Sequence, residues 1–464
     1  MQAVCYSTGE RTSDGGAVAR KELANGELSQ DCQRHKCAAS FRRRIIMRRR
    51  ALRLCSQLSA AAGVHRSVST YAVLTYGSGT VGALGHADTS SVDTPRRVED
   101  NALNAALRSC PSDAAERPSV SAGLFHSAAA VPGVGAFSFG KGAGGRLGQG
   151  DEDNVALPSR VELTHESVDE SHDVSSVACG GLHSAFITRS GRLYTAGFGA
   201  FGALGHGNFK AQYVAAPVRF PTASTRVARV ATGGAHTVAV TTCGSLYAFG
   251  RDEGDGRLGA PVGNEGVNSP TLVVMPPLPG VGTLIPVAAA AGGFHTLVLA
   301  RAGDERTVVL SSGGNANGEC GRDGATWTLG PLDWQSEESG EAIVRIAAGG
   351  FHSAALTSSG ALYTWGAGGG GGLGHGDART KRRPHLVEGL PVRAAAVSCG
   401  SGTTAVVGVD GSLWLWGKNA SKFGTTCPDV LSPQRVDVPS GMHAVDVALG
   451  ASHMVILCRT QIGV

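Results

Sequence analysis

Aromatic residues form only 5% of this chain, and none of its 11 cysteines is paired with another in a CxxC motif. An odd number of scattered cysteines in a long chain does not suit a disulfide framework, so we expect reduced thiols. Cys32, His35 and Cys37 lie close together, but a zinc site needs a second pair of ligands, so no metal is predicted there. The nearest approach to a membrane-spanning stretch, residues 285–302, is interrupted by Gly-Gly-Phe-His, and no such span is expected.

Glycine, by contrast, is abundant and occupies 68 of the 464 positions, roughly twice its usual share. This composition favours many short strands joined by glycine turns. A chain of this length could hold two or three domains, but a ring of small sheets reaches it as a single domain. Internal repeats are the sequence signature of such a ring.

The charge is unevenly distributed along the chain. Residues 1–67 carry 13 Lys and Arg against 5 Asp and Glu, which leaves 28 basic and 32 acidic residues in the remainder. The remainder is therefore mildly acidic, whereas domains that bind nucleic acid usually carry a basic surplus. We predict that nucleic acid is not a direct partner.

The first 68 residues have the composition of a targeting leader. No acidic residue occurs between Cys32 and Ala87, arginine is frequent, and Leu54, Leu58 and Ala61 recur at helical spacing. We predict that residues 1–68 are disordered or removed, with an organelle-targeting segment at about 41–68 that directs import into mitochondria.

Alternatives to this interpretation of the leader are a plastid transit peptide, a nuclear localisation signal (RRRIIMRRR) and a basic arm that binds RNA. Met47 opens the cleanest version of the pattern, so translation from Met47 is an alternative to translation from Met1.

A repeat of about fifty residues fills the rest of the chain. Its first half ends in a Gly-Gly-x-His motif followed by small apolar residues, as in VACGGLHSAFI from Val177 and IAAGGFHSAAL from Ile346. The histidine position recurs seven times and is held once by threonine. We call these seven positions the row residues: His126, His183, His236, His295, His352, Thr403 and His453.

The second half of each repeat predicts two further strands. A glycine-containing hairpin turn leads into a strand of alternating pattern such as LYTWG from Leu362. A glycine-rich loop then leads into a short strand that begins with proline, such as PSRV from Pro158, and proline at the first position suits an edge strand. Four short antiparallel strands cannot bury both faces of their own sheet, so neighbouring units must stack around an axis. We therefore predict an all-β, seven-bladed propeller over residues 69–460.

The two ends of the repeat region predict how the ring closes. Residues 72–98 form the second half of a unit without a first half, and residues 443–457 form a first half without a second half. Joined, they complete the seventh blade, so pairing of N-terminal and C-terminal strands closes the ring.

These units resemble the repeats of the regulator of chromosome condensation (RCC1-like) family, whose members are seven-bladed propellers with this GGxHS or GGxHT strand and a GxxGxLGHG loop. The resemblance covers residues 72–457. Thr403 in place of the row histidine, and GNANGECGRDG from Gly314 in place of the usual loop, depart from the family pattern.

No catalytic, cofactor-binding or metal-binding residue is predicted. Row histidines one blade apart are too widely separated to share a zinc ion, so we expect each to form a hydrogen bond across blades that satisfies backbone groups near the Gly-Gly turn. GAGGGGGLG from Gly366 lacks the Lys-Ser/Thr and the following helix of a phosphate-binding loop and is interpreted as a flexible connection. Acidic residues cluster at 151–153, 162–173 and 337–341, where they form solvated loops or contact a basic partner.

The resemblance implies a protein that binds other proteins. We predict a monomeric, non-enzymatic scaffold or assembly factor in mitochondria that docks a protein or ribonucleoprotein on one rim. The alternative is a guanine-nucleotide exchange factor for a small GTPase. The ultraviolet-sensing branch of the family is set aside, because no tryptophan precedes a row histidine, and no segment is assigned to the extra catalytic domain of ligase members.

Overall fold

The computed structural model describes residues 69–110, 117–164, 173–260, 262, 266–303, 306–332, 334, 341–420 and 428–461. The predicted leader at 1–68, with its targeting segment at about 41–68 and the Cys32–Cys37 cluster, lies outside these residues. Those interpretations therefore stay predictions.

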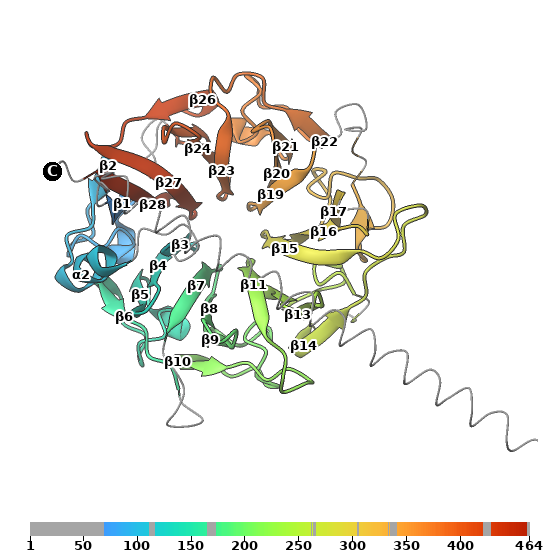
Figure 1. The fold of residues 1–464 in the computed structure, drawn as a ribbon, viewed down its shortest axis with the longest axis horizontal. Coiled ribbons are helices and arrows are strands. Elements are labelled where there is room, and N and C mark those ends of the chain that lie inside the picture. Colours follow the sequence, from blue (N-terminus) through green and yellow to red (C-terminus); the bar gives the residue numbers. More distant parts are fainter. Residues whose placement is uncertain are drawn as a thin grey trace, which may run out of the picture. The chain divides into compact units, whose positions relative to one another are not determined.

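Seven four-stranded antiparallel sheets surround a central axis (Figure 1), which confirms the predicted propeller. Each sheet is one blade, numbered 1 to 7 in chain order. The innermost strands are β3 (Ser119–Ala122), β7 (Val174–Cys179), β11 (Val227–Thr232), β15 (Ile285–Ala291), β19 (Ile343–Ala348), β23 (Ala394–Cys399) and β27 (Met442–Leu449).

The second strand of every blade begins at a row residue. These strands are β4 (His126–Val131), β8 (His183–Thr188), β12 (His236–Thr241), β16 (His295–Arg301), β20 (His352–Thr357), β24 (Thr403–Gly408) and β28 (His453–Gln461). The third strands are β5 (Gly135–Gly140), β9 (Leu193–Gly197), β13 (Leu246–Gly250), β17 (Thr307–Gly313), β21 (Leu362–Gly366), β25 (Leu413–Gly417) and β1 (Ser69–Gly77).

The outermost strands carry the predicted proline, but most of them begin three residues earlier, so that Pro158, for example, is the fourth residue of its strand and not the first. They are β6 (Val155–Arg160), β10 (Gln212–Pro217), β14 (Val267–Val273), β18 (Gly330–Pro331), β22 (Lys381–Leu386), β26 (Val430–Val436) and β2 (Val92–Arg97). An unpaired strand edge attracts other chains, and a proline removes one of its free N–H groups.

The ring closes as predicted in blade 7, whose sheet has the order β2-β1-β28-β27. Strands β1 and β28 pair along nine residues, from Ser69 opposite Gln461 to Gly77 opposite His453. The first and last described strands therefore lie side by side, and hydrogen bonds rather than a covalent link close the ring.

The core consists of the layers between blades. The second strands are almost wholly buried because both of their faces meet neighbouring sheets, and only the ends of β16 and β28 are partly exposed. In β4, Ala128 and Ala130 pack toward blade 2, whereas Ala129 and Val131 pack toward blade 7. Alternation along one strand thus supplies two separate cores.

The repeat pattern did not predict one helix. Helix α2 (Asn101–Ser109) follows β2, and the Asp100 carboxylate accepts a hydrogen bond from the Leu103 backbone N–H at 2.7 Å. Leu103, Ala106 and Leu107 pack on the core between blades 7 and 1.

Three short 3-10 turns, η1 (Thr80–Gly82), η3 (Ala143–Gly145) and η5 (Gly369–Gly371), lie in the glycine-rich loops. Among the described residues no helix is long and apolar enough to span a membrane.

Candidate functional site

Two kinds of connection meet on one rim of the propeller, which we call the glycine rim. It consists of the turns between first and second strands (123–125, 180–182, 233–235, 292–294, 349–351, 400–402 and 450–452) and the glycine-rich loops after the third strands. The two kinds are joined by backbone hydrogen bonds, such as Lys141 N–H to the Phe125 carbonyl at 2.9 Å. The opposite rim carries the hairpins between second and third strands and is called the hairpin rim.

Beneath the glycine rim, the row histidines link each blade to the next. The Nε2 atom of each one lies within 3.0 Å of a Ser or Thr hydroxyl of the following blade. The pairs are His126–Ser184, His183–Thr237, His236–Thr296, His295–Ser353, His352–Thr404 and His453–Ser127. The predicted bond across blades is confirmed, but its partner is a side-chain hydroxyl and not a backbone group of the Gly-Gly turn.

The hydroxyl groups fix the direction of these bonds. Each donates its hydrogen to a carbonyl in the glycine-rich loop of the preceding blade, as Ser184 does to Arg146 at 2.7 Å and Thr296 to Arg257 at 2.6 Å. The hydroxyl oxygen must therefore accept from Nε2–H of the histidine. Each row histidine thus connects the sheets and, through the hydroxyl, the loop of its own blade.

This geometry keeps the row histidines neutral. In four of them the Nδ1 atom has no hydrogen-bond partner within the described chain: His126, His183, His236 and His295. Burial lowers the pKa of His183 to about 4 and that of His295 to about 3, because the charged imidazolium would lose its hydration. Within this buried layer the imidazoles hold blades together.

One blade junction, within the described residues, departs from this scheme. Thr403 replaces the histidine of blade 6, and Met454 replaces the hydroxyl residue of blade 7. The Thr403 hydroxyl is buried and has no partner within the part of the chain described here. Donor and acceptor are therefore lost together at the junction between blades 6 and 7.

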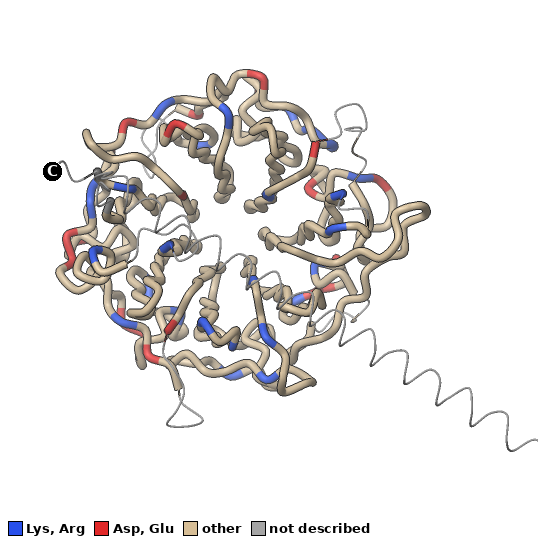
Figure 2. Tube along the Cα trace, viewed as in Figure 1, with Lys and Arg blue, Asp and Glu red and all other residues tan. Residues whose placement is uncertain are grey.

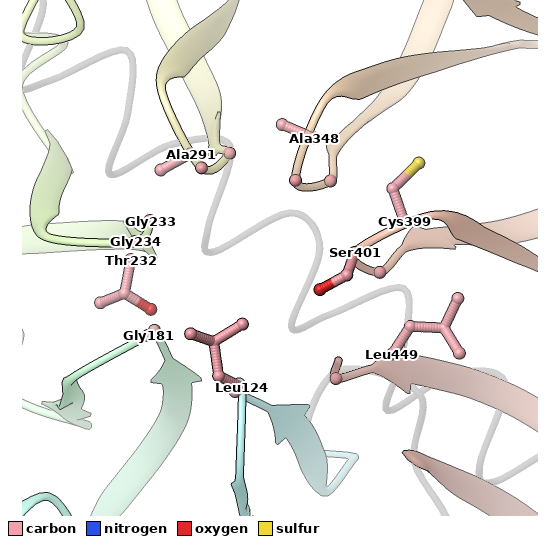
Figure 3. Close-up of a pocket in the computed structure, with 18 of the residues that line it drawn as sticks. Leu124, Gly181, Thr232, Gly233, Gly234, Ala291, Ala348, Cys399, Ser401 and Leu449 are labelled. Atoms are coloured by element: carbon pink, nitrogen blue, oxygen red, sulfur yellow. The ribbon is translucent and has the colours of Figure 1, made fainter. Parts of the chain in front are cut away.

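The Gly-Gly turns form the mouth of the axial channel (Figure 3). Backbone hydrogen bonds connect successive turns, for example Gly181 N–H to the Gly233 carbonyl at 3.0 Å and Gly293 N–H to the Gly349 carbonyl at 3.0 Å. A cavity of about 100 Å³ lies among these turns, lined by glycines, small side chains, Leu124 and Leu449. The lining also includes the thiols of Cys179 and Cys399, and burial raises the pKa of both to about 12, so they stay protonated beside a mainly backbone and apolar surface.

A second set of side-chain bonds holds the glycine-rich loops. In three loops with a Leu-Gly-His sequence, His86, His206 and His375 contact the hydroxyls of Thr75, Thr195 and Thr364 at 2.9–3.0 Å. The loop from Gly366 was interpreted as a flexible connection, but it makes specific contacts. The Gly372 carbonyl accepts hydrogen bonds from the Thr404 hydroxyl at 2.7 Å and the Trp416 indole at 3.1 Å.

In two other glycine-rich loops, a different side chain takes the place of the histidine and contacts the equivalent hydroxyl. Gln149 in blade 1 donates to the Ser138 hydroxyl at 2.8 Å, and Arg322 in blade 4 donates to the Ser311 hydroxyl at 3.1 Å. The unusual loop from Gly314 is therefore anchored to its own blade in the same way, with an arginine in place of the histidine. Its departure from the repeat pattern does not by itself mark a binding site.

Exposed aromatic side chains gather on the glycine rim. Among the described residues, six aromatic side chains with more than about a third of their surface exposed belong to this rim, and a seventh, Tyr213, lies at the start of the adjoining strand β10; the six are Phe125, Phe198, Phe209, Phe294, Trp327 and Phe351. Phe125, Phe294 and Phe351 occupy the x position of the Gly-Gly-x-His motif. The repeat pattern did not predict this set, although the x position points to three of its members.

Comparison with known proteins places the chain in a family. Residues 72–456 match the RCC1-like domain. The chain belongs to the RCC1-like domain family.

The relatives of this RCC1-like propeller differ in function. It is 35% identical to the RCC1 domain-containing protein RUG3, mitochondrial, of Arabidopsis thaliana over 359 residues, which cover 74% of this chain and 76% of RUG3. It is 32% identical to the ultraviolet-B receptor UVR8 of the same plant, with 72% and 73% covered. A match to the human E3 ubiquitin-protein ligase HERC2 at 34% identity covers 68% of this chain but only 6% of the ligase.

Solved structures support the fold. Human WBSCR16 aligns with a TM-score of 0.67 at 21% identity, covering 84% of this chain and all of that one. Prp20p from Saccharomyces cerevisiae, whose crystal structure was described with its binding to Gsp1p and histones, aligns with a TM-score of 0.68 at 21% identity, with 86% and 93% covered. At these identities the likeness establishes the seven-bladed architecture alone.

The acidic clusters predicted in the RCC1-like propeller are only partly described. Asp151, Glu152 and Asp153 are exposed on the glycine rim in blade 1. Of the other two clusters, residues 162–164, Asp173 and Glu341 are described, and the rest lies outside the described residues. Within the described chain no group of three or more His, Cys, Asp or Glu side chains is placed to hold a metal ion.

Proposed function

We propose that the protein is a non-enzymatic scaffold or assembly factor that binds a protein or ribonucleoprotein partner on the glycine rim. The observation that carries this proposal is the different placement of the polar and the aromatic side chains. The buried histidines and hydroxyls join the blades, whereas the aromatic side chains of one rim face solvent. Exposed aromatic clusters are typical of protein interfaces.

The described charges support a protein as the direct partner. Residues of both charges, Lys and Arg as well as Asp and Glu, are spread around the ring (Figure 2), whereas a nucleic-acid site needs a basic face. We propose that the propeller is a monomer and that any RNA is reached through a protein.

We further propose that the protein acts in mitochondria. The name of RUG3 and the Arg-rich composition of the leader after Cys32, where no acidic residue occurs, support this location. A fluorescent protein fused to residues 1–68 should enter mitochondria, and the same fusion with Arg42, Arg43, Arg44 and Arg48 changed to Gln should lose import. A fusion that collects in nuclei or plastids contradicts the mitochondrial location.

The partner is identified by affinity purification of the tagged full chain after cross-linking in the cell, with peptide mapping of the mature N-terminus. The proposal expects the same proteins to be recovered with and without nuclease treatment. A recovery that depends wholly on RNA would contradict direct protein binding.

Guanine-nucleotide exchange on a small GTPase is the alternative function. Under the scaffold proposal, the purified chain leaves the rate of GDP release from a panel of small GTPases unchanged. Accelerated release from any one of them would favour the alternative.

A further inference from the structure

Aromatic and guanidinium groups form a continuous strip across four blades of the glycine rim. The strip contains Phe198 and Phe201 of blade 2, Arg251 and Arg257 of blade 3, Phe294 of blade 4 and Phe351 of blade 5. We call these six residues the aromatic strip. It follows the rim around more than half of the channel mouth.

Direct contacts connect the members of the strip. The Phe198 and Phe201 rings meet edge to face at 6.2 Å, and the Arg251 guanidinium lies 4.4 Å from the centre of the Phe201 ring. The Arg257 guanidinium lies 5.0 Å from the centre of the Phe294 ring. Phe294 and Phe351 are stacked at 5.5 Å, so the contacts cross two blade junctions through arginines and one through the ring pair.

Acidic neighbours hold both arginines in place. Arg251 pairs with Glu253, and Arg257, whose side chain is only 2% exposed, pairs with Asp255 and Glu253. These two carboxylates balance the two guanidinium charges within the strip. Arg257 is thus buried beneath the rings, and a partner meets a preordered surface of rings and Arg251 without having to immobilise a flexible cation.

This chemistry fits a protein better than a nucleic acid. Aromatic residues and arginine are enriched at the centre of protein interfaces, where they contribute most of the binding energy. A single-stranded nucleic acid also stacks on aromatic rings, but it needs a positively charged track, and here the arginine charges are already balanced.

The end of the strip in blade 2 borders an acidic loop of blade 1. A Cβ atom on Gly144 of the blade 1 loop would lie 3.1 Å from Cβ of Phe198, so the two loops are in contact. Asp151, Glu152 and Asp153 follow in that blade 1 loop and are exposed. A partner lying along the strip would therefore meet apolar surface first and negative charge at this end.

We propose that the aromatic strip binds a protein segment whose apolar side chains cover the rings and whose flanking Lys or Arg residues contact Asp151, Glu152 and Asp153. This inference rests on the proposed function in requiring a protein partner, and it adds the surface and the chemistry of the segment. The bound segment therefore has one orientation, in which its basic residues lie over blade 1 and its apolar residues lie over blades 2 to 5.

The test uses the purified full chain and a phage-displayed library of random peptides. Enriched peptides should combine an apolar block with a cluster of Lys or Arg. The pair Phe294→Ser and Phe351→Ser should weaken their binding by about tenfold or more. The matched pair Val274→Ser and Val409→Ser, which changes exposed apolar residues of the hairpin rim, should leave binding unchanged.

A second variant tests this orientation. The triple change Asp151→Asn, Glu152→Gln and Asp153→Asn should abolish the preference for basic flanks while binding of the apolar block persists. Thermal unfolding of each variant separates loss of binding from loss of folding.

Three outcomes would overturn the inference: no enrichment, enriched peptides that bind the Phe294/Phe351 variant equally well, or acidic flanks in place of basic ones. Binding of a labelled oligouridine that is lost in the same variant would assign the strip to nucleic acid instead. Peptides that bind elsewhere on the chain would leave the proposed function standing and remove only this surface.

Discussion

Thr403 of blade 6 and Met454 of blade 7 occupy the two positions that a histidine and a hydroxyl residue hold at the six other blade junctions. The two departures lie in different repeats but at one contact. A histidine against Met454 would leave its Nε2–H unsatisfied, and a serine against Thr403 would have no imidazole donor. The two residues therefore depart from the pattern together, because the hydrogen bond needs one residue from each of the two blades.

Restoring both residues should recreate the missing bond. Thr403→His alone and Met454→Ser alone should each destabilise the protein, since each buries a polar group without its partner. The double variant should be more stable than the sum of the two single changes by about 1 kcal/mol, the usual net value of a buried hydrogen bond.

Urea unfolding of all four proteins measures this coupling. The space is available, because Gly400 retains the glycine that the imidazole needs at the other junctions. Additive effects of the two changes would show that the junction cannot accommodate the bond.

Stability should fall steeply in mild acid. The pKa values of His183, His352 and His453 are lowered by burial to about 4 and that of His295 to about 3, whereas unfolded histidine titrates near its ordinary pKa of about 6.5. Between these values the unfolded chain binds more protons, so the free energy of unfolding falls as pH falls. The slope approaches about 1.4 kcal/mol per pH unit for each such histidine.

Denaturant unfolding at about pH 7 and about pH 5 should therefore differ by several kcal/mol. A His295→Gln variant, which can still donate to Ser353 but does not titrate, should show a smaller difference. Equal stability at both pH values would mean that the row histidines are not kept neutral.

Removing β28 should abolish the closed ring. A chain that ends at Ser452 lacks the strand that pairs with both β1 and β27, and both would then expose unpaired edges. We expect aggregation or loss of a cooperative thermal transition, whereas a chain that ends at Gln461 should unfold like the full protein. A cooperative transition at the original temperature in the shorter chain would show that the remaining blades close without β28.

The sequence predicted the parts of this fold that repeat. Each row residue marks the first position of a second strand, and the half-units at 72–98 and 443–457 predict the closure in blade 7, because a repeat constrains every copy in the same way. The partner of the row histidine was also present in the sequence, since Ser or Thr follows every row residue except His453, which is followed by Met454.

The features that do not repeat were not predicted. Helix α2 occupies the insertion after β2, where no other blade supplies a template, and its position depends on packing of Leu103 and Leu107 against blades 7 and 1. The aromatic strip was missed because the x position of the motif holds Phe in only three of the seven blades and the arginines come from a loop of a different length. Contacts between dissimilar loops become visible only when the ring brings them together.

The glycines of the channel mouth should tolerate no side chain. A Cβ atom on Gly292 would lie 2.4 Å from Cε1 of His295 and 2.6 Å from the Gly349 carbonyl oxygen of the next blade. Neither neighbour can move without breaking the His295–Ser353 bond or the backbone bond between blades, so Gly292→Ala should cost about 3 kcal/mol of stability, at the upper end for overpacking.

Gly369→Ala is the matched control, because nothing lies within 4 Å of its added Cβ and its φ is not left-handed. That change should be neutral or stabilise by about 0.5 kcal/mol through the unfolded state. Urea unfolding of the two variants compares them directly, and similar stabilities would show that the mouth of the channel is not closely packed.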